Sequence, residues 1–195
     1  MNPLSRRKLL QAVPTALVAA GALAVLGEAP AEASTLPSIG AVSVTRLWGT
    51  RGVRQRLVGT RRYRTVRLPR TKALFEGTDV SILDKGGLCH WEGTAPLFAP
   101  GNCVLFGHRT HAGGPLRNAH RLRVGDRIVL TSGGTTQAYV VSVKPFVIHS
   151  GDVSSVVTWG DNSGSFLTLV ACSKANRLPT STKYRLLVRA HALSA

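Results

Sequence analysis

Short apolar or alternating runs recur along the chain from about Tyr63 onward. They read NCVLFGH, DRIVLTS, TQAYVVSVKPFVI, GSFLTLVAC and KYRLLVRAHAL, and stretches rich in turn-forming residues, such as SGG, HSGD and GDNSG, separate them. No strong 3.6-residue period continues over a useful length, which argues against long helices. Many short strands within one domain-sized stretch therefore predict an all-β fold, either a closed barrel or a sandwich.

The clearest hairpin in this pattern is RIVLTSGGTTQAYVVSV, residues 127–143. Gly133 and Gly134 supply the positive φ that a tight turn needs, and β-branched residues flank them. Only short helical segments are expected, around residues 79–84 and 115–120. The 195 residues are enough for one ordinary domain and a leader.

The first 33 residues have the three parts of an export signal. A basic segment at residues 5–10, SRRKLL, precedes an apolar stretch at residues 16–26 and a small-residue cleavage site, Ala31-Glu32-Ala33. The apolar stretch is shorter than the roughly 20 residues that cross a bilayer. We therefore expect residues 1–33 to be an export signal, by the general or the twin-arginine route, with a retained N-terminal anchor as the alternative. Either one places the rest of the chain outside the cytoplasm, at the outer face of the membrane or in the cell wall.

The formal net charge of +16 indicates attraction to polyanions. Export removes nucleic acid from the candidates and leaves anionic polymers of the envelope. The charge is concentrated between Arg46 and Lys72, where ten residues are Lys or Arg and none is acidic. We interpret residues 34–62 as a basic stalk or linker, either simply solvated or in specific electrostatic contact with wall or membrane polymers. The folded domain is expected at residues 63–195.

The chain has three cysteines, and outside the cytoplasm thiols tend to be oxidised. An odd number leaves one thiol free or in an intermolecular bond, and sequence alone leaves all three pairings open. Cys89 and Cys103 flank the turn-rich segment HWEGTAPLFAPGN, so they are candidates for a disulfide between neighbouring strands. Cys172, which ends an apolar run, is then the free thiol. Taken alone, such a residue is typical of an inert core cysteine.

A reactive role for Cys172 needs further groups. A nucleophilic thiol requires a base or cation that holds it as thiolate, and acyl transfer also requires a donor for the oxyanion. His108 follows an apolar strand in CVLFGHRTH, and Arg185 lies on a predicted strand in TKYRLLVRA. Alternation puts Arg185 on the same strand face as Leu187 and Arg189. Each of these residues, taken separately, is more typical of a solvated surface.

Five motifs follow one another between about residues 63 and 195. They are VRLPRTKALFEGTDVSILDKGG, HWEGTA, PGNCVLFGHRTHAGGPLRNAHRLRVGDRIVL, FLTLVACSK and YRLLVRA. Cys172 lies 64 positions after His108, and Arg185 lies 13 positions after Cys172. In this order the motifs resemble those of a sortase, and among sortases the chain is most similar to the actinobacterial class E group.

The resemblance implies an eight-stranded closed β-barrel with short helices and cysteine transpeptidase activity. By the same resemblance, Cys172 is the nucleophile, His108 the general acid and base, and Arg185 the cation that steadies the substrate carbonyls or the oxyanion. His111, three residues after His108, and Arg189, on the strand face of Arg185, are the alternatives to these two.

Two further residues match or depart from a motif next to the cysteine. Thr168 matches the first position of the family's TLxTC motif, whereas Ala171 stands where the family carries the second threonine. The resemblance makes both positions candidates for substrate binding. The departure at Ala171 bears on substrate positioning or rate more than on the nucleophile.

The implied partners are a protein and an amine. The protein carries a C-terminal LAxTG-like or LPxTG-like sorting signal, cleaved between Thr and Gly, and the class E resemblance favours LAxTG. The amine comes from a peptidoglycan precursor or a pilin lysine. No cofactor is needed for thiol acyl transfer, and neither the acidic residues nor the histidines are spaced like a calcium or zinc set.

Two other functions remain as alternatives. One is a weakly catalytic sortase-fold protein that binds anionic wall polymers through its basic surface, which the charge and Ala171 favour. The other is an L,D-transpeptidase acting on peptidoglycan. It is disfavoured because Cys172 lacks the SHGC context of that family.

Overall fold

The computed structural model describes residues 37–153, 155, 159, 163–173 and 183–193. The predicted export signal, residues 1–33, lies outside the described residues. Within the described ranges, no helix is long and apolar enough to cross a membrane.

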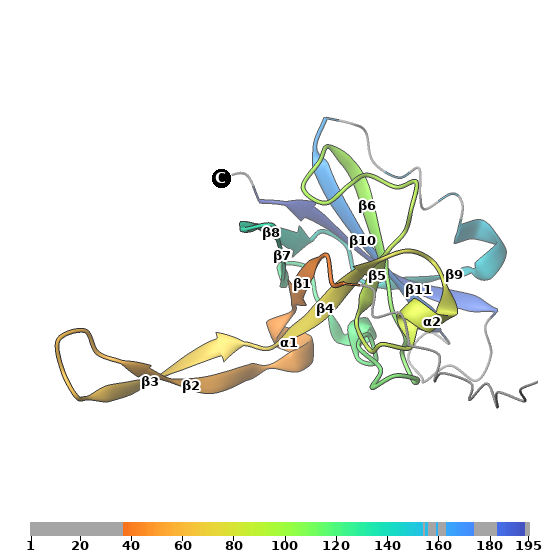
Figure 1. Ribbon diagram of the computed structural model, residues 1–195. Coiled ribbons are helices and arrows are strands. Elements are labelled where there is room, and N and C mark those ends of the chain that lie inside the picture. Colours follow the sequence, from red (N-terminus) through yellow and green to blue (C-terminus); the bar gives the residue numbers. More distant parts are fainter. Residues whose placement is uncertain (1–36, 154, 156–158, 160–162, 174–182, 194–195) are drawn as a thin grey trace, which may run out of the picture. The chain divides into compact units, whose positions relative to one another are not determined.

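Short strands make up most of the regular structure, as the alternating pattern predicts (Figure 1). The strands are β1 (Gly40–Ser43), β2 (Thr50–Arg56), β3 (Tyr63–Pro69), β4 (Thr71–Glu76), β5 (Leu88–His90), β6 (Gly101–Phe106), β7 (Arg127–Ser132), β8 (Thr135–Val141), β9 (Phe146–His149), β10 (Ser165–Ser173) and β11 (Tyr184–Ala192). The short helices are α1 (Thr45–Trp48), α2 (Val80–Leu83), η1 (Ala119–Arg121) and η2 (Ser150–Asp152).

A closed barrel forms the core of the domain. Paired strands follow one another in the order β10, β6, β5, β4, β1, β7, β8, β11, and β11 pairs back onto β10. In the described part of the chain, eight strands therefore close on themselves, while β9 pairs with Tyr184–Leu187, a part of β11 that β8 does not reach. This confirms the predicted all-β fold and its eight-stranded closed barrel.

Alternation along β10 and β11 separates the barrel interior from the outside. Leu167, Leu169 and Ala171 on β10 belong to the main buried cluster, together with Leu186 and Val188 on β11. The intervening residues face the other way because successive side chains of a strand point to opposite faces. The outer face is therefore shared by Thr168, Val170, Cys172, Arg185, Leu187 and Arg189. The alternation in TKYRLLVRA predicts that its two arginines lie on one face, and they do.

The predicted β7–β8 hairpin is confirmed. Thr131 pairs with Thr136 and Ser132 with Thr135, which leaves a two-residue loop. Its residues, Gly133 and Gly134, have φ angles of 54° and 82°. Both lie in the left-handed region, where a side chain is disfavoured, so the two glycines fix this register.

The observed helices agree in part with the helical segments predicted from the sequence. α2 lies inside the segment expected at 79–84. The segment expected at 115–120 contains no α-helix, and a single 3₁₀ turn, η1, overlaps its end. Pro115 and Leu116 there are held by loop contacts instead, since Pro115 O accepts from Trp48 Nε1 at 2.8 Å and Leu116 N donates to His108 O.

Part of the segment predicted to be a stalk, residues 34–62, belongs to the folded barrel instead. β1 lies within residues 34–62, and it pairs with β4 on one side and β7 on the other. Val42 and Val44 are fully buried in the barrel core. β2 forms a separate two-stranded sheet with β3. The folded domain therefore already includes Gly40, because a four-residue apolar strand inserts into the barrel wall.

The cysteine pairing expected between Cys89 and Cys103 is corrected by the structure, in which both are free and buried. β5 and β6 are antiparallel neighbours, as expected, but Cys89 lies opposite Phe106. Cys103 is three residues from Phe106, an odd number, so the two thiols face opposite sides of the sheet. Cys89 packs with Phe75 and Ile82, whereas Cys103 lies in the main core.

We expect alkylation to distinguish the three thiols. Burial raises the pKa of Cys89 to about 11 and that of Cys103 to about 12, so both are neutral and unreactive near pH 8. Cys172 is partly exposed. Iodoacetamide should add one adduct to the native protein and three after unfolding in denaturant, as measured by intact mass. Two or three adducts on the native protein would contradict this burial pattern.

Candidate active site

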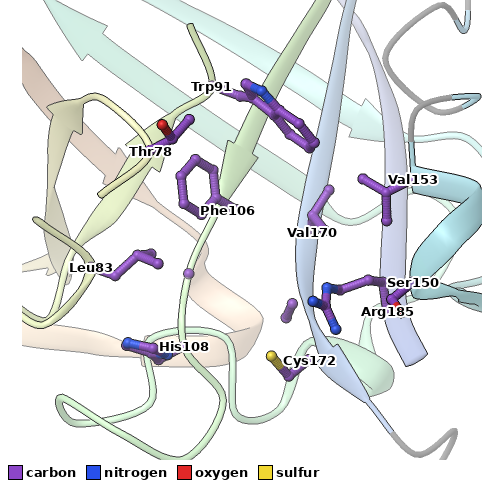
Figure 2. Close-up of a pocket in the computed structure, with 12 residues that line it drawn as sticks. Thr78, Leu83, Trp91, Phe106, His108, Ser150, Val153, Val170, Cys172 and Arg185 are labelled. Atoms are coloured by element: carbon purple, nitrogen blue, oxygen red, sulfur yellow. The ribbon is translucent and has the colours of Figure 1, made fainter. Parts of the chain in front are cut away.

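A pocket of about 390 Å³ lies where β6 and β10 end. Its lining includes all three residues predicted to carry the chemistry, Cys172, His108 and Arg185 (Figure 2). A volume of this size is typical of sites that hold a small ligand or part of a peptide. The sequence-predicted trio is therefore brought to one cavity.

Strand register places Cys172 beside Arg185. The two residues are direct partners in the antiparallel β10–β11 pair. Opposed residues on one sheet face have Cβ atoms about 5 Å apart, so the two side chains are neighbours. Figure 2 shows both projecting into the same part of the pocket. The thiol thus has a guanidinium as its cross-strand neighbour.

The register of a second strand pair explains why His108 lies near Cys172. β6 and β10 are parallel, and Phe106 pairs with Val170, an offset of 170 − 106 = 64 residues. The same offset separates His108 from Cys172, since 172 − 108 = 64. Gly107 N donates to Val170 O at 3.1 Å, which continues the contact one residue past β6. The sequence spacing of these two residues is therefore the register of a parallel strand pair.

His108 is oriented by an acidic residue that sequence reasoning did not select. Its Nε2 lies 3.0 Å from Asp84 Oδ1, at the end of α2. A carboxylate on one ring nitrogen fixes the ring's orientation and leaves the other nitrogen for exchange of protons. His111 contacts the His108 ring edge-on, with centroids 5.7 Å apart, but it does not line the pocket.

Arg109 is a second residue that the sequence did not reveal. It is only 1% exposed, although it directly follows His108. Its Nη1 donates to Ser173 Oγ at 3.3 Å and to Cys172 O at 3.5 Å, and its Nη2 donates to His120 Nδ1 at 3.1 Å. Burial lowers the pKa of Arg109, and its electrostatic interaction with Cys172 opposes that shift. The loop that carries His108 is thereby tied to the end of β10.

The two candidate substrate-binding residues have different positions. Thr168 is fully buried, and its Oγ1 donates to Asn102 Oδ1 at 2.9 Å, which links β10 to β6. It does not line the pocket. Ala171 borders the pocket, but its side chain belongs to the buried core cluster. A threonine there would bring a hydroxyl to that apolar cluster.

Arg189 is engaged elsewhere. Its guanidinium carbon lies 4.3 Å from the centroid of the Trp159 ring and 5.2 Å from that of Phe146. Burial lowers its pKa, and its Nε has no hydrogen-bond partner within the described residues. Arg185, rather than Arg189, is the arginine at the pocket.

The chemistry available to the pocket is that of a thiol, an imidazole and a guanidinium. In the described part of the chain, no group of three or more His, Cys, Asp or Glu residues could hold a metal ion. This set of side chains suits acyl transfer through a thioester.

The sequence between Val66 and Leu193 decides the family. A family model described as the sortase domain matches residues 66–193. The chain belongs to the sortase family. No curated protein matches the sequence. Sortases are cysteine transpeptidases that act on proteins carrying sorting signals and join them to amines, so this protein is an enzyme of that kind.

Solved sortase structures of several classes resemble this sortase. Sortase E from Streptomyces avermitilis is 28% identical, with a TM-score of 0.60 over 80% of this chain and 88% of that one. A point mutant of the same enzyme is 30% identical over the same shares, with a TM-score of 0.59. A lid mutant of sortase A from Corynebacterium diphtheriae is 23% identical, with a TM-score of 0.62 over 82% of this chain and 72% of that one, and it supports the fold alone.

Proposed function

We propose that this sortase uses Cys172, His108 and Arg185 to cut a C-terminal sorting signal between Thr and Gly and to transfer the shortened protein to an amine. The observation that carries the proposal is their meeting at one pocket, with Cys172 directly opposite Arg185 in the β10–β11 register. The site lies on the part of the chain that the family model matches.

In the first half-reaction, the Cys172 thiolate attacks the carbonyl carbon of the threonine. Arg185 stabilises the negative charge that develops on the carbonyl oxygen. The C–N bond then breaks, His108 gives a proton to the departing glycine amine, and a thioester remains on Cys172.

In the second half-reaction, an amine attacks the thioester carbonyl. His108 takes the proton that the amine loses, and the C–S bond breaks to regenerate the Cys172 thiolate. A peptidoglycan precursor or a pilin lysine supplies this amine. Water in its place gives hydrolysis of the signal.

The pocket's apolar lining suits the leucine and alanine of an LAxTG-like signal. Leu83, Trp91, Phe106, Val153 and Val170 supply it. The similarity to sortase E from Streptomyces avermitilis supports class E, and with it a preference for LAxTG over LPxTG. We further propose that the enzyme works at the outer face of the membrane, where exported substrates arrive.

Mass spectrometry of the full chain with LAxTG and LPxTG peptides tests the proposal. We expect a thioacyl adduct on Cys172 and a product cut after threonine, with more product from LAxTG. A glycine peptide or a lysine peptide added as acceptor should give the ligated product. A thiol that iodoacetamide labels but neither peptide acylates would contradict the proposed substrate.

We expect Arg185→Ala to lower kcat/KM by about 10²-fold to 10³-fold, the usual loss when one oxyanion donor is removed. Arg189→Ala is the matched control, because it removes an arginine from the same strand face but outside the pocket. It should lower thermal stability, since its guanidinium packs on two rings, and leave activity per folded molecule nearly unchanged. Equal losses of activity in the two variants would contradict the role of Arg185.

A second candidate function is binding of anionic wall polymers by a weakly catalytic protein. The net charge of +16 favours it. Binding that added salt abolishes and that Cys172→Ala leaves unchanged, in a protein that does not acylate, would select this function.

A further inference from the structure

The β2–β3 hairpin is a strongly cationic element separate from the barrel. Residues 50–69 contain seven arginines and neither Asp nor Glu. The two strands pair only with each other in the described structure, forming a sheet of their own (Figure 1). The family match begins at Val66, so most of this hairpin lies outside it.

Register divides the hairpin's side chains between two faces. One carries Arg54, Arg56, Tyr63 and Arg67, and the other carries Arg51, Val53, Arg64, Val66 and Leu68. Both faces are open to solvent, because only the two valines and Thr50 are partly covered. Neither face resembles a surface that packs on the barrel.

The hairpin's positive charge is not neutralised by the described chain. No arginine of residues 50–69 forms an ion pair with a carboxylate among the described residues. The contacts they make are with neutral groups: Arg54 over the Tyr63 ring at 4.8 Å, Arg64 to Gln55 Oε1, and Arg56 to Thr60 O. A two-stranded hairpin is marginally stable in water, and crowded like charges oppose its folding. An anionic surface would remove that repulsion.

The loop at the end of the hairpin indicates which anionic surface fits. Val58 is fully exposed there, and Arg56, Arg61 and Arg62 surround it in sequence. Tyr63, which has an apolar ring and a polar hydroxyl, is 54% exposed beside them. Apolar and aromatic side chains among basic ones are typical of segments that lie at a bilayer interface. A soluble polyanion offers phosphates but no apolar phase for Val58.

We propose that this hairpin docks on the anionic surface of a lipid bilayer. The arginines bind lipid phosphates, for which the planar guanidinium provides paired donors, and Val58 enters the boundary between headgroups and acyl chains. The proposal is independent of the chemistry at Cys172. It gives the enzyme a membrane contact of its own, whether residues 1–33 are cleaved or retained.

Limited trypsin digestion of the full chain tests the docking directly. Cleavage after Arg61 and Arg62 is followed with vesicles of phosphatidylglycerol and phosphatidylcholine in equal parts, and with vesicles of phosphatidylcholine alone. We expect the anionic vesicles to slow it about tenfold or more, because each basic residue near an anionic surface adds to binding. Cleavage after Arg121 and Arg123, exposed residues outside the hairpin, is the internal control for loss of trypsin to the vesicles. Equal slowing at both pairs of sites would overturn the proposal.

Two matched variants separate a bilayer from a soluble polymer. Val58→Ser should lose much of the protection by anionic vesicles, whereas Val124→Ser, at an exposed valine outside the hairpin, should keep it. Polyglycerol phosphate at the same phosphate concentration should protect poorly. Full protection of the Val58→Ser protein, or equal protection by the polymer, would overturn the bilayer as the partner and select an anionic polymer instead.

Discussion

Replacing Cys172 with alanine is expected to reduce transfer and hydrolysis to background, a loss of about 10⁴-fold or more. The thioester cannot form without the sulfur, and no other described cysteine lines the pocket. Cys103 lies in the main core, and Cys89 is buried in a small cluster beside Phe106. Release of product from an LAxTG peptide measures the loss of activity, and the intact mass of the enzyme shows whether a thioester forms.

The fold of the Cys172→Ala protein should be unchanged, because Cys172 lies at the pocket and contributes nothing to the main core. Cys89→Ala is the matched control. It should keep transfer activity per folded molecule and lose stability, because it removes a buried sulfur from a small cluster. Transfer that persists in the Cys172→Ala protein would refute the assignment of the nucleophile.

Replacing His108 with alanine is expected to lower kcat by about 10²-fold to 10⁴-fold, the range that a positioned general acid and base contributes. The loss should appear in both half-reactions, because one imidazole gives and takes the proton. Added imidazole should restore part of the activity, since the substitution leaves room at the pocket. Single-turnover acylation and steady-state transfer measure the two halves.

His111→Ala is the control for this experiment. His111 touches the His108 ring but lies outside the pocket lining, so its loss should change the rate little. A large loss in His111→Ala with a small one in His108→Ala would exchange the two assignments. Asp84→Asn should fall between them, because it weakens the contact that orients His108.

Local patterns in the sequence predict those parts of the structure that depend on neighbouring residues. The paired glycines fix the β7–β8 turn, and alternation puts Arg185 and Arg189 on one strand face. The separation of His108 from Cys172 also carries structural information, because it equals the offset of a parallel strand pair. The partners of a single strand, by contrast, depend on the whole barrel.

The residues that sequence reasoning missed owe their roles to distant contacts. An arginine next to a histidine is typical of a surface, yet Arg109 is buried because the end of β10 and His120 receive its donors. Asp84 reaches His108 across 24 positions of chain. The predicted disulfide between Cys89 and Cys103 is wrong because the two side chains face opposite sides of the sheet. Adjacent strands do not by themselves bring two side chains to one face.

The position of β1 in the barrel bears on how the enzyme can be shortened. A chain that begins at Tyr63, where the strand-rich sequence pattern starts, lacks the strand between β4 and β7. Both would become free edges with unpaired N–H and C=O groups, which favour pairing with other chains. Loss of the buried Val42 and Val44 side chains would also leave a cavity in the barrel core. Such a protein would tend to aggregate however intact its catalytic residues are, so the N-terminal cut for recombinant expression belongs before Gly40.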